Sequence, residues 1–233
     1  MSDLCKWLHE SLAALPLMSF PFELAALPNN GIYFFYERDE TWGHDGEHLR
    51  IVRVGTHRDG NFRSRISEHY LLDDRKMGFS QNVPAQHERS IFRKNLGRAL
   101  LNRSQDPYLR VWELDFTSRA SREKFRHFRD VGKEKEIELE ITQILRQNFS
   151  FRCIAVDEQQ NRMGATGLER HLIGTVAQCG QCRSSEQWLG RHSPVHKIRQ
   201  SGLWLVQHLS APPISQDLLS TISAAIERSR SNT

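Results

Sequence analysis

The 233-residue chain contains 38% hydrophobic and 26% charged residues, the proportions of an ordinary globular protein. No apolar stretch approaches the roughly 18 residues that a bilayer span needs, which argues against a membrane protein. The net charge of +4 suits a polyanionic partner, because neutralised phosphates release counterions, although charge alone identifies no partner. The length favours one elaborated domain, residues 1–233, over two domains.

The cysteines bear on the compartment and on metal binding. They stand at Cys5, Cys153, Cys179 and Cys182. Four unevenly spaced cysteines do not form a disulfide framework, and no basic leader precedes an apolar run, so we expect a cytoplasmic protein. The C-x-x-C of Cys179 and Cys182 could begin a zinc site, but structural zinc needs four ligands. No second pair follows, and the nearby His192 and His196 stand in an unusual order, so the pair alone does not indicate zinc.

The first half of the chain predicts a helix, a hairpin and a second helix. Ser2–Leu15 favours a helix, which the prolines that follow it interrupt. Gly31–Tyr36 is rich in aromatic and β-branched residues, and Leu49–Thr56 follows after a glycine-containing loop, so these two runs predict an antiparallel hairpin. Arg63–Tyr70 predicts a short helix in which Arg65 and His69 share a face.

Residues 71–149 resemble an insertion between core elements. A polar loop comes first, then a basic helix near Ser90–Asn102, a strand-like run at Leu109–Phe116 and a charged helix from Ser118. Apolar residues at helical spacing predict one more helix, at Ile137, Ile141, Ile144 and Leu145.

The last third of the chain predicts a return to the core and a C-terminal extension. Phe151–Val156 has strand character, and Gly167–Cys179 predicts a helix with an apolar stripe. The extension contains a loop at Trp188–Pro194, a strand-like Gly202–Leu209 and a closing helix after Pro213.

Several of these segments together resemble the GIY-YIG nuclease family. The matching residues are Gly31-Ile32-Tyr33 on the first strand, Arg53-Val54-Gly55 on the second, Arg65 and His69 on the helix behind, and Glu169 on a later helix. The tail segments Trp188–Pro194 and Ile198–Trp204 are also similar to those of bacterial GIY-YIG proteins of about this length. The resemblance implies an α+β fold with a small three-stranded mixed sheet flanked by helices. Its core would be residues 29–70 and 150–180, with an insertion at 71–149 and an extension at 181–233.

The resemblance also implies an activity, the metal-dependent hydrolysis of DNA phosphodiester bonds, in restriction, phage defence or repair. Tyr33 would position and deprotonate the attacking water, and Glu169 would be the protein ligand of one Mg²⁺ or Mn²⁺. Arg65 would contact the scissile phosphate, with His69 beside it. Arg53 stands where the family usually has a second Tyr, and could contact phosphate or favour the phenolate of Tyr33.

The remaining motif residues, Gly31, Ile32 and Gly55, would shape the two strands. A basic surface for DNA is expected on the helix near Ser90–Asn102 and in the tail. Its residues would be Arg89, Arg93, Lys94, Arg98, Arg191 and His192. A solvated helix face explains the basic helix equally well. A homodimer could serve double-strand cleavage.

Each candidate also has a purely structural explanation. Tyr33 lies in an aromatic run that suits a core, and Arg65 with His69 could be a solvated helix face. Thr166-Gly-Leu-Glu169 fits a capping box, in which the glutamate bonds back to the helix cap. Arg53, and Leu205 where the similar bacterial proteins carry Asn, motivate an alternative, a catalytically impaired DNA-binding module of this fold. A zinc-stapled interaction domain using Cys179 and Cys182 is a third, more distant interpretation.

Overall fold

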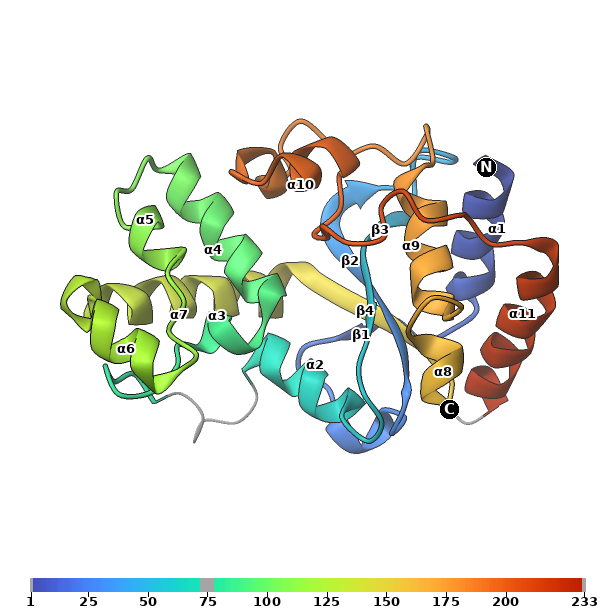
Figure 1. The fold of residues 1–233 in the computed structure, drawn as a ribbon. Coiled ribbons are helices and arrows are strands. Elements are labelled where there is room, and N and C mark those ends of the chain that lie inside the picture. The colour runs from blue at the N-terminus through green and yellow to red at the C-terminus, as the bar shows by residue number, and fades with distance from the viewer. Residues whose placement is uncertain (1, 72–77, 232–233) are drawn as a thin grey trace.

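The computed structural model describes residues 2–71 and 78–231, which form an α+β fold around one antiparallel sheet (Figure 1). The strands are β1 (Met18–Ser19), β2 (Gly31–Thr41), β3 (Leu49–Thr56) and β4 (Phe149–Ala155). Their order is β1-β4-β2-β3, and every neighbouring pair runs antiparallel.

The sheet differs from the expected three-stranded mixed sheet in two respects. The chain re-enters the sheet where Phe149 pairs with Glu37 and leaves it where Ala155 pairs with Gly31, so β4 runs antiparallel to β2. The short strand β1 then adds a fourth member, because Met18 and Ser19 pair with Phe151 and Ser150. The hairpin of β2 and β3 is confirmed, with β3 at the bounds expected from the sequence.

Helices cover both faces of the sheet, which explains why the β2 sequence is apolar without alternation (Figure 1). Tyr33 and Phe35 pack on one face against the helices α2 (Phe62–Tyr70), α4 (Ile91–Arg103) and α7 (Val131–Asn148). Ile32 and Phe34 pack on the other face against α1 (Ser2–Ala13), α9 (Leu168–Ala177) and α11 (Gln216–Ser231). Each face of the sheet therefore has its own hydrophobic core.

Helices and the loops between them make up the described part of the expected insertion, up to the start of β4 at Phe149. Its shorter elements are α3 (Gln86–Arg89), α5 (Leu109–Trp112), α6 (Arg119–Phe125) and the 3-10 helix η3 (Arg126–Phe128). The strand expected at Leu109–Phe116 is wrong, because Trp112 packs over Gly97 of α4 and donates its indole N–H to Lys94 O at 3.0 Å. Part of the polar loop expected after Leu71, at residues 72–77, lies outside the described residues.

The C-terminal extension also departs from its expected strand. It contains the 3-10 helix η4 (Leu189–His192) and the helix α10 (His196–Ser201), which ends at Gly202 in the left-handed conformation. A non-helical stretch then passes beside β3, joined to it by the bond from Trp204 N–H to Val52 O at 2.8 Å. The expected strand at Gly202–Leu209 is therefore wrong. The small elements η1 (Leu24–Ala26) and α8 (Gln159–Arg162) complete the fold.

Candidate active site

The two halves of the expected motif meet at Tyr33 and Gly55, which pair across β2 and β3. The Tyr33 ring lies directly over Gly55, where an added β-carbon would come within 2.5 Å of Tyr33 Cζ. A second glycine, Gly31, has the same kind of role, because a β-carbon there would overlap with Ile154 O of the neighbouring strand. Only glycine allows these close approaches, so both positions are dictated by geometry.

A hollow of about 350 Å³ opens beside Tyr33. Four of the five catalytic candidates line it, Tyr33, Arg53, Arg65 and Glu169, although they come from four different elements. A larger hollow of about 790 Å³ lies elsewhere, beside Arg38 and Asn148, but none of these four residues lines it. The structure thus brings together side chains that are as far apart in the sequence as residues 33 and 169.

Glu169 lies in the first turn of α9 and accepts a hydrogen bond from Thr56 N–H at 3.2 Å. The capping-box explanation for this residue is wrong, because Gly167 rather than Thr166 caps the helix and makes no side-chain bond to it. Burial raises the pKa of Glu169, while the Thr56 amide and the charges of His208 and Arg53 oppose this shift. A cation at the hollow would further favour the carboxylate form.

Arg53 is buried at the floor of the hollow. One end of its guanidinium donates to Trp204 O at 2.5 Å, and its Cζ lies over the Phe92 ring, 4.9 Å from the ring centroid. Its Nε is buried and has no hydrogen-bond partner among the described residues. Arg53 therefore positions the tail and places a buried positive charge beside the hollow.

Arg65 lies at the rim of the hollow, with 15% of its side chain exposed. It donates to Arg89 O at 2.5 Å and contacts the Glu68 carboxylate at 3.3 Å. Its planar fork has five N–H donors, so these contacts leave donors for a phosphate.

His69 does not line the hollow beside Arg65, which corrects the expected arrangement. Its side chain is fully buried behind Tyr33, with Nε2 3.3 Å from the Tyr33 hydroxyl and Nδ1 2.8 Å from Ser90 Oγ. Burial and the charges of Arg65, Arg53 and Arg93 lower the pKa of His69 well below its ordinary value, so its imidazole is neutral at pH 7. A neutral imidazole has one N–H donor and one lone pair, so it can hydrogen-bond to the Tyr33 oxygen and to Ser90 Oγ together.

The hollow contains polar residues that the sequence did not indicate. Asn95 of α4, Gln207 and His208 line it together with Leu205, at the position where an Asn was expected. His208 has a positive φ of 59°, uncommon for a residue other than glycine. Nothing in the sequence indicated Gln207 and His208, because the tail reaches the hollow only through its tertiary contact with β3.

The basic residues expected to contact DNA are not equivalent. Arg93 is completely buried and donates to the Glu138 carboxylate at 2.6 Å and to Thr142 Oγ1 at 2.8 Å, so it cannot reach DNA in this structure. Lys94 and Arg98 pair with Glu88 and Glu113. The expected DNA contact is therefore wrong for Arg93. The charges of Lys94 and Arg98 are partly neutralised by their carboxylate partners, which weakens the case for a DNA contact there.

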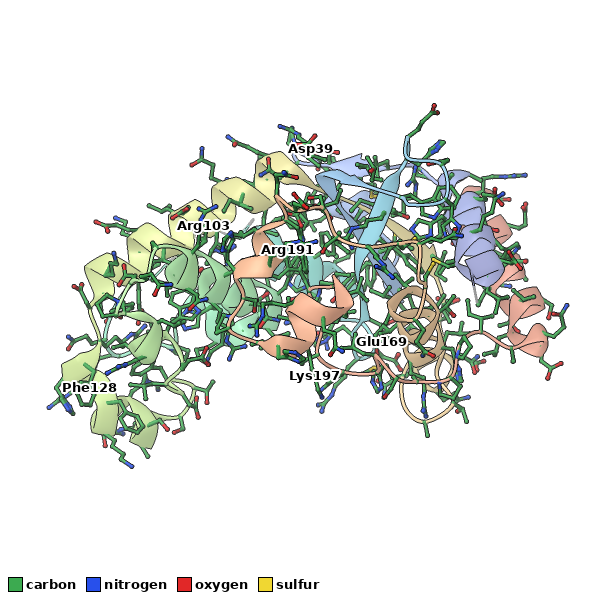
Figure 2. The ribbon with its side chains drawn as sticks, turned by 90° about the horizontal axis from the view of Figure 1, so that it is seen from above. Asp39, Arg103, Phe128, Glu169, Arg191 and Lys197 are labelled. Atoms are coloured by element: carbon green, nitrogen blue, oxygen red, sulfur yellow. The ribbon has the colours of Figure 1, made fainter. Side chains whose placement is uncertain are left out.

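Arg89, Arg191 and His192 are exposed and remain candidates for a DNA contact. Lys197 of α10 is also exposed, and Figure 2 shows it on the same side of the molecule as Glu169. The surviving cations therefore lie in the tail and next to Arg65 rather than along one helix.

The comparison with known families agrees with this geometry. A GIY-YIG domain model matches residues 16–232, almost the whole chain, so the protein belongs to the GIY-YIG family. This family is typically composed of nucleases and generally uses divalent metal ions. No curated protein and no solved structure matches the chain. None of the described helices is long and apolar enough to cross a membrane.

Proposed function

We propose that the protein is a metal-dependent endonuclease that hydrolyses DNA phosphodiester bonds in the hollow beside Tyr33. The observation that carries this proposal is the meeting of a phenol, two guanidinium groups and a carboxylate around one cavity of about 350 Å³. Hydrolysis needs an activated water and stabilisation of charge on the phosphoryl and leaving oxygens, and these groups have the chemistry for both tasks.

The carboxylate that lines the hollow is a suitable ligand for a magnesium ion. Glu169 is the carboxylate among the described residues that line the cavity, and its Thr56 contact engages one oxygen. Mg²⁺ is typically held by one or two carboxylates and completes its shell with waters and substrate phosphates. When bound there, the ion would act as a Lewis acid toward the phosphoryl and leaving oxygens.

Tyr33 is the base of the proposal, and His69 holds it in position. The Tyr33 hydroxyl lies 3.3 Å from Nε2 of the neutral His69 ring, whose Nδ1 lies 2.8 Å from Ser90 Oγ. The phenolate form of Tyr33 removes the proton from the attacking water. His69 acts through Tyr33, so it is a positioning residue in this scheme.

Arg65 and Arg53 hold the phosphate. Arg65 at the rim binds non-bridging oxygens with its free donors, and the guanidinium of Arg53 adds its positive charge from the floor. Their positive charge stabilises the extra negative charge of the transition state. The exposed Arg89, Arg191 and Lys197 contact the flanking backbone, where each neutralised phosphate adds affinity that salt weakens.

A second candidate function is a DNA-binding module without catalysis. It is favoured by Leu205, an apolar wall of the hollow where the similar bacterial proteins carry Asn. Such a module would bind DNA through the same cations but would leave the phosphodiester intact.

A plasmid nicking assay separates these functions. Supercoiled DNA is incubated with Mg²⁺ or Mn²⁺, and the wild type is compared with Glu169→Gln and Tyr33→Phe, with the exposed Glu186→Gln as the matched carboxylate control. We expect metal-dependent nicking by the wild type and the control, with losses of at least about 10²-fold in the two site variants. DNA binding without nicking would support the module instead, and cleavage of RNA alone would contradict a DNA substrate. A single site makes one cut at a time, so double-strand cleavage would require a second copy or two sequential events.

A further inference from the structure

A second cluster of chemically reactive side chains lies away from the hollow. Cys5 on α1, His44 in the loop between β2 and β3, and Cys179 and Cys182 after α9 place their ligand atoms within 4.8 Å of one another. Figure 1 shows the start of α1, that loop and the end of α9 at one corner of the molecule. We propose that these four residues bind one structural Zn²⁺ ion.

The spacing of the four atoms matches a tetrahedral zinc site. Zinc bonds of about 2.3 Å to sulfur and 2.0 Å to nitrogen give tetrahedron edges of about 3.8 Å between sulfurs and about 3.5 Å between sulfur and nitrogen. The Cys5 and Cys182 sulfurs are 3.6 Å apart, and His44 Nε2 is 3.3 Å from Cys179 Sγ. A disulfide needs about 2.05 Å between sulfurs, and all four cysteines are free.

The surrounding backbone is shaped for these ligands. A β-carbon on Gly43 would overlap with Gln181 O, so only glycine lets the loop bearing His44 lie against the turn between Cys179 and Cys182. The backbone N–H groups of Gln181 and Cys182 hydrogen-bond to the Cys179 sulfur, as N–H groups do for metal thiolates. Trp42 is buried in one hydrophobic cluster with the three cysteines.

The nearby His9 is a support for the site rather than a ligand. Its Nδ1 lies 2.9 Å from Cys5 O, and its Nε2 accepts the Ile51 N–H at 3.1 Å, so both ring nitrogens are engaged. His9 also stacks on Trp42 with ring centroids 4.9 Å apart. These contacts orient Cys5 and Trp42 and leave His44 as the imidazole ligand.

The ligand set selects zinc and a structural role. Three thiolates and one imidazole in a buried tetrahedron suit Zn²⁺, whereas Mg²⁺ and Ca²⁺ require oxygen ligands. Four protein ligands close the coordination shell and leave no position for substrate. The ion would join α1, the hairpin loop and the end of α9, the helix whose first turn carries Glu169. This proposal is independent of the nuclease proposal, because no ligand lines the hollow.

The test measures metal content and coordination in the untagged full chain. We expect one zinc ion per chain by elemental analysis, released when the thiols are titrated with a mercurial reagent. Replacement by Co²⁺ should give the thiolate charge-transfer and d–d bands of a tetrahedral site. The pair Cys179→Ser with Cys182→Ser should lose the zinc, and Cys153→Ser, which removes the cysteine outside the cluster, should retain it.

The cobalt spectrum of the wild type keeps the proposal falsifiable if the double variant does not fold. A folded wild type that holds no zinc after purification from zinc-replete cells, and that gives no thiolate bands with Co²⁺, would overturn the proposal. A disulfide between Cys179 and Cys182 in the purified protein, or stoichiometric copper or iron in place of zinc, would also overturn it.

Discussion

The hydroxyl end of the Tyr33 ring lies over Gly55, so the catalytic candidate on β2 takes its position from the missing side chain of a residue on β3. The two glycine-containing motifs are therefore one structural unit. The first sets the strand that carries the phenol, and the second provides the space in which the phenol lies.

Gly55→Ala should remove nuclease activity by moving the phenol. The added β-carbon would come within 2.5 Å of Tyr33 Cζ, so the ring must shift, and a misplacement of about 1 Å can cost about 10²-fold in rate. Gly78→Ala is the control, because no atom lies within 4 Å of the added carbon. Nicking rates and circular dichroism of both variants test this. Normal nicking by Gly55→Ala would show that the position of Tyr33 does not determine the rate.

The contact between His69 and Tyr33 predicts non-additive losses. If His69 acts only by holding the Tyr33 hydroxyl in position, His69→Gln should reduce the nicking rate about 10²-fold, but should cost nothing further once Tyr33 is Phe. Rates of the two single variants and the double variant complete the cycle. Independent, multiplicative losses would mean that His69 has a separate role.

Local sequence patterns predicted much of the fold and part of the candidate site. The β-branched run at β3 and the apolar stripe of α9 located these two elements, and the resemblance to the GIY-YIG family anticipated the common hollow of Tyr33, Arg65 and Glu169. The roles of these three residues stay predictions. Local patterns fail at Trp112, where a strand-like run is helical in the structure and packs on Gly97 of a neighbouring helix.

Long-range pairings explain the other differences between sequence and structure. In the sequence Arg93 resembles its exposed neighbour Arg89, but in the structure it is buried and paired with Glu138, 45 residues away. The C-x-x-C looked incomplete because the other two members of its cluster, Cys5 and His44, come from distant segments. Neither pairing leaves a periodic signal in the sequence.

The burial of Glu169 predicts the acidic limb of the pH–rate profile. Because its pKa is raised, the carboxylate needed to bind Mg²⁺ is lost at a higher pH than for an exposed glutamate. Metal binding competes with the proton, so raising the Mg²⁺ concentration should move this limb to lower pH. Nicking rates across pH at two Mg²⁺ concentrations measure the shift. A limb that does not move with Mg²⁺ would assign it to another group.

Arg89 and Arg93 should separate DNA affinity from stability. Arg89→Ala removes an exposed cation and should reduce the slope of log K against log salt by about 1, with little effect on unfolding. Arg93→Leu leaves the buried Glu138 without its guanidinium partner and should cost about 3–5 kcal/mol of unfolding free energy. Salt-dependent binding and urea unfolding test both. Equal stability of the Arg93→Leu protein would contradict the importance of this buried pair.

Glu37 predicts how stability depends on pH. Its Oε2 accepts the indole N–H of both Trp188 and Trp204 at 2.9 Å, yet burial outweighs these bonds and raises the pKa of this carboxyl to about 7. The folded state therefore holds a proton that the unfolded state, with a pKa near 4.5, releases. The unfolding free energy should fall as pH rises from about 4.5 to 7, by about 3 kcal/mol, and the loss should be complete above pH 7.

Glu37→Gln isolates this effect, because the amide oxygen can still accept from both indoles but carries no titrating proton. The variant should lose the decline between pH 4.5 and 7 and should be more stable than the wild type at pH 8. Urea unfolding at several pH values measures both curves. Parallel curves for the two proteins would mean that Glu37 ionises at the same pH in the folded and unfolded states, which would require water or a cation to reach the pair of tryptophans that packs the tail onto the sheet.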